Sequence, residues 1–128
     1  MEEVIQVADK VNFNGRIYSL EILNCVVDDA KRNGGPILGK IGMDHIDWRN
    51  GLSLSQTSHI IKDLKVKDDT LIADIEILET PEGKRLKELM KFEKMVYRMA
   101  GVGEVDENGM VLNYKLTSIN AVPALSAA

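Results

Sequence analysis

The stretch that decides the fold is SQTSHIIKDLKVKDDTLIADIEILETPEG, residues 55–83. Its segments 55–66 and 70–78 are rich in β-branched residues, and apolar positions recur in them at the spacing of half-buried β-strands. Asp68 and Asp69 lie between the segments and favour a turn, since short polar side chains bond to nearby backbone groups. We therefore expect an antiparallel hairpin here.

Each strand of this hairpin should carry one apolar face, because successive side chains of a strand point to opposite sides. On the first strand we expect Ile61 to face away from the other apolar side chains, which are Ile60, Leu64 and Val66. On the second strand one face holds Leu71, Ala73, Ile75 and Ile77.

A helix should follow the hairpin at once. Thr80 is a good N-cap, Pro81 suits the first helical position, and Glu82 interacts favourably with the positive end of the helix dipole. The helix is expected to run to about Phe92, with its inward face formed by Leu86, Leu89 and Met90.

Upstream of the hairpin the pattern predicts a strand, a helix and a short strand. Residues 2–11 contain β-formers without a breaker, and residues 12–15 form a turn. Ser19 is the expected N-cap of a helix that ends at residues 33–36, with Leu20, Leu23, Val27 and Ala30 at helical spacing. Residues 37–43 are a short apolar strand, and residues 47–54 are a polar loop.

Downstream of the second helix, residues 94–106 and 110–122 predict two more strands. Gly101 and Gly103 interrupt the first of them, and Asn108-Gly109 is a hairpin turn signal. The resulting order is β, α, β, β, β, α, β, β. It predicts one α+β domain over residues 1–128, with a curved, largely antiparallel sheet or small barrel and two covering helices.

Composition restricts the class of protein. A chain of 128 residues is the length of one domain, and its net charge of −4 argues against a nucleic-acid partner. Cys25 is the single cysteine, so an internal disulfide is excluded, and its apolar neighbours predict burial. No apolar run reaches bilayer length and residues 1–10 do not resemble a signal peptide, which favours a cytosolic protein without a membrane partner.

His45 is the first candidate for catalysis. It follows an apolar run and lies between Asp44 and Asp47, so it could act as a general base. A base of this kind needs a hydroxyl or thiol to activate. The stretch where we would expect one, residues 97–103, reads YRMAGVG and contains neither.

His59 is the other histidine, and Ser58 precedes it. Adjacent strand residues point to opposite faces, so we expect that the two cannot serve each other and that His59 is structural. A metal site formed by Asp44, His45, Asp47 and His59 matches no established ligand spacing, and we expect no metal or cofactor. A relocated nucleophile near His45 would have to come from Ser53, Ser55 or Thr57.

Four segments, taken in order, resemble the prohead (capsid maturation) proteases of tailed phages, which share the herpesvirus assemblin-like serine protease fold. The first is Asn12-Phe13-Asn14-Gly15-Arg16-Ile17-Tyr18, and the second is Gly42-Met43-Asp44-His45, where the family carries its catalytic histidine. The third comprises Ser58–Leu64 and Ile77–Lys84, and the fourth comprises Gly101–Gly103 and Lys115–Thr117. Proline follows the first two motifs in the family, whereas Ser19 and Ile46 stand there in this chain.

The family's nucleophile lies in a Gly-x-Ser-Ser-Arg-Gly-x-Gly stretch. Alignment on the glycines places Arg98 and Met99 at the two serine positions and Ala100 at the arginine, while Asn120 stands where the family often has Asp. Arginine and methionine cannot accept an acyl group. The resemblance therefore implies that the catalytic serine is lost and that His45 is a vestigial base.

From this resemblance we expect a non-catalytic structural protein of a tailed-phage virion, specifically a decoration (cement) protein bound to the major capsid protein. Alternatives are an active maturation protease with a displaced nucleophile and an internal scaffold or core component. The expected location is the virion capsid, assembled in the host cytoplasm, with the major capsid protein or other virion proteins as partners; a homo-oligomer is also compatible. Tyr97, Arg98 and Met99 are of types enriched at interfaces and could bind a partner, or could equally fill the core.

The expected second helix also has a basic face. A partner surface is one interpretation of it, and a solvated face balanced by nearby glutamates is the favoured one. Its cations are Lys84, Arg85, Lys87, Lys91 and Lys94.

Overall fold

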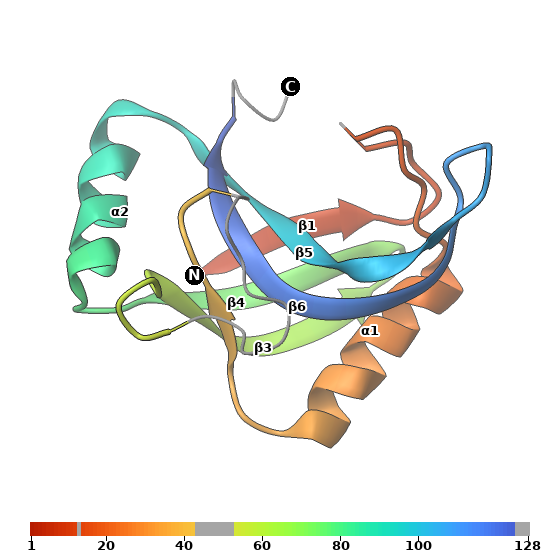
Figure 1. Ribbon diagram of the computed structural model, residues 1–128, viewed down its shortest axis with the longest axis horizontal. Helices are drawn as coiled ribbons and strands as arrows, with labels where there is room; N and C mark the ends of the chain where they lie inside the picture. Colours follow the sequence, from red (N-terminus) through yellow and green to blue (C-terminus); the bar gives the residue numbers. More distant parts are fainter. Residues whose placement is uncertain (13, 43–52, 125–128) are drawn as a thin grey trace.

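The computed structural model describes residues 1–12, 14–42 and 53–124, and Figure 1 shows its arrangement. Within these ranges, two helices and six strands follow the predicted order β, α, β, β, β, α, β, β. They are β1 (Glu2–Val7), α1 (Leu20–Asn33), β2 (Ile37–Gly39), β3 (His59–Lys67), β4 (Thr70–Ile77), α2 (Pro81–Phe92), β5 (Met95–Val105) and β6 (Val111–Pro123).

The strands form a four-stranded antiparallel sheet, in the order β1-β4-β3-β2, and a long two-stranded hairpin, β5-β6. The hairpin joins the sheet just beyond β2, where Ala121 N donates to Lys40 O (2.9 Å) and Gly42 N donates to Ala121 O (2.8 Å). At the other edge, β5 lies beside β1 (Figure 1), and no ladder joins these two strands among the described residues. The α+β prediction is confirmed, and the described strands form a curved structure with one open seam rather than a closed barrel.

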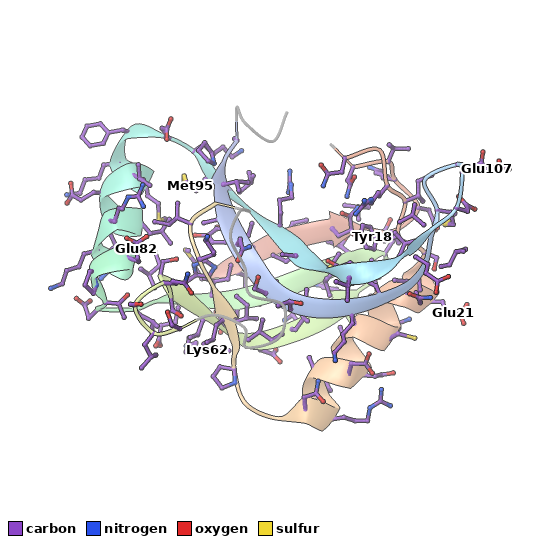
Figure 2. The ribbon with its side chains drawn as sticks, viewed as in Figure 1. Tyr18, Glu21, Lys62, Glu82, Met95 and Glu107 are labelled. Atoms are coloured by element: carbon purple, nitrogen blue, oxygen red, sulfur yellow. The ribbon has the colours of Figure 1, made fainter. Side chains whose placement is uncertain are left out.

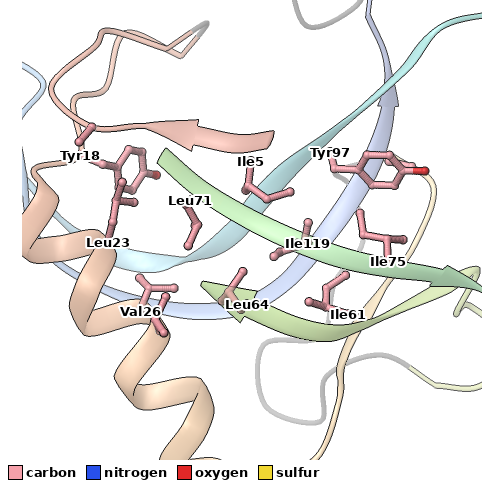
Figure 3. Close-up of a cluster of buried hydrophobic side chains, with 14 of the residues drawn as sticks. Ile5, Tyr18, Leu23, Val26, Ile61, Leu64, Leu71, Ile75, Tyr97 and Ile119 are labelled. Atoms are coloured by element: carbon pink, nitrogen blue, oxygen red, sulfur yellow. The ribbon is translucent and has the colours of Figure 1, made fainter. Parts of the chain in front are cut away.

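Apolar side chains of both sheets and both helices meet in one core. Figure 3 shows its centre, where Leu23 and Val26 of α1 approach the side chains of β3 and β4. Burying such side chains contributes about 1.5–3 kcal/mol each, so this cluster is the main stabilising feature of the fold. None of the described helices is long and apolar enough to cross a membrane.

Helix α1 begins at the predicted cap, where Ser19 Oγ accepts a hydrogen bond from Ile22 N (3.2 Å). It packs against β3 and β6 through Leu23, Val26 and Val27. Cys25 is exposed, so the prediction that it is buried is wrong. Its position lies on the helix face opposite the core, although its sequence neighbours are apolar.

Helix α2 is also capped as predicted. Thr80 Oγ1 accepts a hydrogen bond from Gly83 N (3.0 Å) and donates one to Thr57 O (2.7 Å), which fixes the helix to the segment before β3. Leu86 is fully buried and Leu89 packs against the core. Met90 is 40% exposed, so the expectation that it faces inward is wrong.

A β-bulge changes the faces of β3. The register with β4 shifts between Ile61 and Asp63, which inserts one extra residue into β3. A one-residue shift moves all later side chains to the opposite face. Ile61 is therefore buried together with Leu64, and the prediction that Ile61 faces away from Leu64 is wrong.

Candidate functional site

The first segment of the family resemblance and Gly101, one residue of the fourth, meet at a pocket at the open seam between β1 and β5. Four side chains of the first segment line it, together with the part of β5 that carries Arg98 and Met99. Its volume is about 140 Å³, and we call it the Arg16–Arg98 pocket. The lining residues are Gln6, Asn12, Asn14, Arg16, Tyr18, Arg98, Met99, Ala100, Gly101 and Tyr114.

The loop over this pocket is held in shape by its first asparagine. Asn12 Oδ1 accepts hydrogen bonds from Asn14 N (2.9 Å) and Arg16 N (3.0 Å), and Asn12 O accepts one from Gly15 N (2.9 Å). Gly15 has φ +75°, a conformation that suits glycine. The local turn therefore places the side chains of this motif along one wall of the pocket.

The same loop is tied to the β5-β6 hairpin. Ile17 N donates to Gly109 O (2.8 Å), and Val111 N donates to Ile17 O (2.9 Å). Tyr18 packs edge-on against Tyr114, with the ring centroids 5.4 Å apart, and Figure 2 labels Tyr18 where the loop meets the hairpin. Burial raises the pKa of both tyrosines, so both stay neutral donors at physiological pH.

Arg98 is half-buried in this pocket. Its Nη1 donates to Tyr97 O (3.4 Å), and burial lowers the pKa of the guanidinium from its ordinary value. An arginine remains protonated in proteins, so Arg98 brings a positive charge to the position that the resemblance assigns to a serine. Met99, the next residue, packs against the core.

The two glycines of β5 have a packing role in this hairpin. A Cβ at Gly101 would lie well inside van der Waals contact with Lys115 O and the Tyr114 ring, and one at Gly103 would collide with Asn113 O. These glycines permit the close approach of β6. Their presence beside Arg98 and Met99 is thus explained by strand packing, without catalysis.

Tyr97 does not lie on the surface. It is 1% exposed, and its ring packs edge-on against His59 with the ring centroids 5.3 Å apart. Figure 3 shows it among the core side chains with Ile75 and Ile119. Of the two roles expected for Tyr97, its burial agrees with filling the core.

Ser58 and His59 do contact each other, which corrects the argument made from strand alternation. Ser58 precedes the first residue of β3, so the alternation of a regular strand does not apply to it. Ser58 Oγ lies 2.8 Å from His59 Nδ1, and His59 Nε2 lies 2.7 Å from Ile119 O. Since a carbonyl only accepts, Nε2 carries the proton and Nδ1 accepts from the serine hydroxyl.

This serine–histidine pair is sealed inside the protein. Both residues are 0% exposed, and burial lowers the pKa of His59 from its ordinary value of 6.5. A Cβ at Gly39 would collide with His59 Nε2, so the ring packs directly against the backbone of β2. A peptide substrate cannot reach Ser58 in this arrangement, and the pair serves to connect β3 to β6.

His45, Asp44 and Asp47 lie outside the described residues. Gly42, the last described residue before them, is hydrogen-bonded to Ala121. Ala121 follows Asn120, which pairs across the hairpin with Arg98 and whose Oδ1 accepts from Lys40 N (3.2 Å). The described segment leading toward His45 therefore ends beside the β6 residues that face Arg98.

The other hydroxyl candidates have structural roles. Ser53 and Ser55 are exposed, with their Oγ atoms 2.9 Å apart, while Thr57 is buried and its Oγ1 donates to Ser53 O (2.7 Å). Within the described part of the chain, no three carboxylate, cysteine or histidine side chains gather as metal ligands would.

The basic face of α2 is largely neutralised. Lys87 pairs with Glu79 (2.7 Å), Arg85 with Glu82 (3.2 Å) and Lys91 with Glu88 (3.0 Å). These exposed pairs agree with the favoured interpretation of a solvated, balanced face.

Sequence reasoning missed the pocket as a site. The motif residues at 12, 14, 16 and 18 are polar or aromatic and lie close together in the sequence around a turn. That clustering of polar and aromatic side chains could have indicated a shared surface. Gln6 and Tyr114 carry no local signal, because only the tertiary fold brings β1 and β6 to this loop.

The element order, the four-stranded sheet with its attached hairpin and the two helices define a fold like that of the prohead proteases. Among solved structures, the bacteriophage T4 capsid assembly protease, gp21, superimposes with a TM-score of 0.79 at 23% sequence identity. The superposition covers 95% of this chain and 79% of the T4 chain. No protein-family model and no curated protein matches the sequence.

Proposed function

We propose that this chain is a non-catalytic structural component of a phage capsid, a decoration protein that binds the shell formed by the major capsid protein. One observation carries the proposal. Arg98 and Met99, which occupy the positions that the resemblance assigns to the nucleophile, lie in a pocket of a capsid-protease-like fold and cannot accept an acyl group.

Two further observations support the loss of catalysis. The serine–histidine pair in the described part of the chain, Ser58 and His59, is fully buried and holds β3 against β6. The glycines beside the old nucleophile position are required by hairpin packing. Stability therefore accounts for the serine–histidine pair and for the two glycines.

A cleavage comparison tests the non-catalytic part of this proposal. Purified wild-type protein is incubated with the capsid precursor beside the His45→Ala and Ser58→Ala variants, and products are followed by intact-mass spectrometry. We expect the precursor to remain intact in all three reactions. Cleavage by the wild type that either variant abolishes would support the alternative, a protease with a displaced nucleophile.

Restoring a hydroxyl should not restore activity by itself. Catalysis also needs an oxyanion hole and an oriented base, so Arg98→Ser and Met99→Ser are expected to be inactive on the same precursor. Peptide cleavage by either variant would show that the rest of the catalytic machinery is intact and that its loss is confined to one residue.

Co-sedimentation with assembled shells tests the binding part. Arg98→Ala is expected to weaken binding, while Arg85→Ala should not, because Arg85 lies on α2 and pairs with Glu82 there. Figure 1 shows α2 at the opposite end of the molecule from the loop over the pocket. Equal binding by both variants would show that Arg98 does not contribute to capsid binding.

A further inference from the structure

We propose that the groove between α1, β2 and β6 binds an extended segment of a partner protein, which adds a strand to the edge of β2 and places an acidic side chain near Lys115. This surface is separate from the Arg16–Arg98 pocket, since the two share no lining residue. Three features of the groove carry the proposal: an interrupted strand ladder, an open apolar wall and a cation without an ion pair.

The ladder between the end of β2 and β6 consists of a single bridge in the part of the chain that the structure describes. Ile41 and Ala121 form this bridge in the parallel orientation. Its first bond runs from Ala121 N to Lys40 O (2.9 Å). In a regular parallel ladder, the next bond toward the start of β2 would run from Lys40 N to Ile119 O.

Two side chains take the place of that bond. Asn120 Oδ1 accepts a hydrogen bond from Lys40 N (3.2 Å), and His59 Nε2 donates to Ile119 O (2.7 Å). Both backbone groups are therefore engaged, and the ladder ends at Lys40. Before this point β2 lies at the edge of the four-stranded sheet.

Leu38 presents unpaired backbone groups at this edge. Backbone groups of alternate strand residues point to the same side, so those of Leu38 point toward β6, as those of Lys40 do. The intervening Gly39 points to the β3 side, where its carbonyl accepts from Ser58 N (2.9 Å). No backbone hydrogen bond joins Leu38 to a described residue of β6. An unpaired strand edge is a template for pairing with another chain.

The groove beside this edge is open and of sufficient size for a peptide. Its volume is about 610 Å³, within the roughly 300–1,000 Å³ of typical ligand sites. Gly34 and Gly35 line it, and a Cβ at either position would meet no atom within 4 Å. Their loop joins α1 to β2 at the lower edge of Figure 1, so a segment can enter the groove from this side.

Apolar side chains form one wall of the groove. Val26 is buried, whereas Ala30, Ile37 and Leu116 are half-buried and keep apolar surface in contact with solvent. A strand added to β2 would place alternate side chains against this wall, which is how strand addition obtains its side-chain specificity. The segment is therefore expected to carry apolar residues at alternate positions.

The charges on the groove favour an acidic partner. Asp29 and Arg32 form an ion pair with each other. Lys115 lines the same groove, is exposed, and forms no ion pair with a described residue. A carboxylate on the incoming segment complements this remaining charge, whereas a second cation would be repelled.

An NMR titration of the full chain tests the proposal. The probe is the peptide acetyl-Val-Glu-Val-Thr-Val-amide, and its control carries the same side chains on a fully N-methylated backbone, which cannot donate strand hydrogen bonds. We expect saturable shifts at groove residues with the probe alone. At saturation, hydrogen exchange of the Leu38 amide should slow by at least about tenfold, because its N–H becomes paired.

Two further comparisons test the charge. Replacing glutamate by glutamine in the peptide, or Lys115→Met in the protein, should weaken binding by about threefold, as expected for an exposed ion pair. Lys94→Met is the matched control, since Lys94 is an exposed lysine between α2 and β5, outside the groove, and it should leave the affinity unchanged.

Three outcomes would overturn the proposal. Absence of saturable shifts at the groove would exclude it as a peptide site. Equal binding of the N-methylated control would exclude strand addition. Equal binding of the glutamine peptide, together with an unchanged affinity of Lys115→Met for the glutamate peptide, would exclude an acidic partner.

Discussion

Replacing His59 with alanine should destabilise the protein by about 4 kcal/mol. The loss has two sources in the structure. Removing a fully buried ring leaves a cavity that costs about 2 kcal/mol, toward the low end for large-to-small core changes. Removing the donor to Ile119 O leaves a buried carbonyl unsatisfied, which adds roughly 1–3 kcal/mol.

The partner serine contributes less. Ser58→Ala removes the donor to His59 Nδ1 and should cost about 1–2 kcal/mol, because only one lone pair is left without its hydrogen bond. The double variant should cost less than the sum of the single variants, since each single change already breaks the same 2.8 Å bond. Ser55→Ala, at an exposed position, is the matched control and should change stability by less than about 0.5 kcal/mol.

Urea unfolding followed by circular dichroism measures these differences in the free energy of unfolding. Two results would refute the reasoning: a loss below about 1 kcal/mol for His59→Ala, or strict additivity of the two changes. Either would mean that the serine–histidine bond does not hold β3 against β6.

Three further predictions concern the pH dependence, the hairpin and the helix cap. Burial lowers the pKa of His59 below 6.5, so the unfolded state binds more protons than the folded state as the pH falls below that value. The free energy of unfolding should therefore decrease with falling pH in this range. In urea titrations at several pH values, His59→Gln should lack the part of this decrease that His59 causes. Gly101→Ala should cost about 1–3 kcal/mol, since its Cβ would collide with Lys115 O, and an unchanged melting temperature would contradict this packing. Thr80→Ala should cost about 2 kcal/mol by losing the bonds to Gly83 N and Thr57 O, whereas Thr80→Ser should retain most of the stability in the same melts.

Local signals predicted the elements well. Ser19 and Thr80 are the caps observed, and the Asn108-Gly109 turn joins β5 to β6 with Gly109 at φ +88°. Such signals act over three or four residues, so the sequence contains all the information they need. The same holds for the fold class, which follows from element order.

Features that depend on packing were predicted less well. The bulge after Ile61 changes the face of every later β3 residue, and nothing in the local pattern marks it. Cys25 has apolar neighbours, but the core contacts the other face of α1. Tyr97 belongs to an interface-rich residue type, yet alternation along β5 directs it toward His59.

The Arg16–Arg98 pocket also depends on tertiary packing, so local sequence signals could not predict it. Its residues come from β1, the loop before α1, β5 and β6, and tertiary structure alone places them together. The family resemblance identified Arg98 and Met99 by position, and it assigned no role to Asn12, Asn14 or Arg16. Their shared pocket is a finding of the structure.

The most direct test of the proposed structural role is the number of copies of this chain in mature virions. Quantitative mass spectrometry of purified particles, normalised to the major capsid protein, gives that number. A decoration protein should be present as an intact chain in many copies per particle. Its absence from mature virions, while present in precursor shells, would contradict the proposal and support a scaffold or protease that leaves the particle.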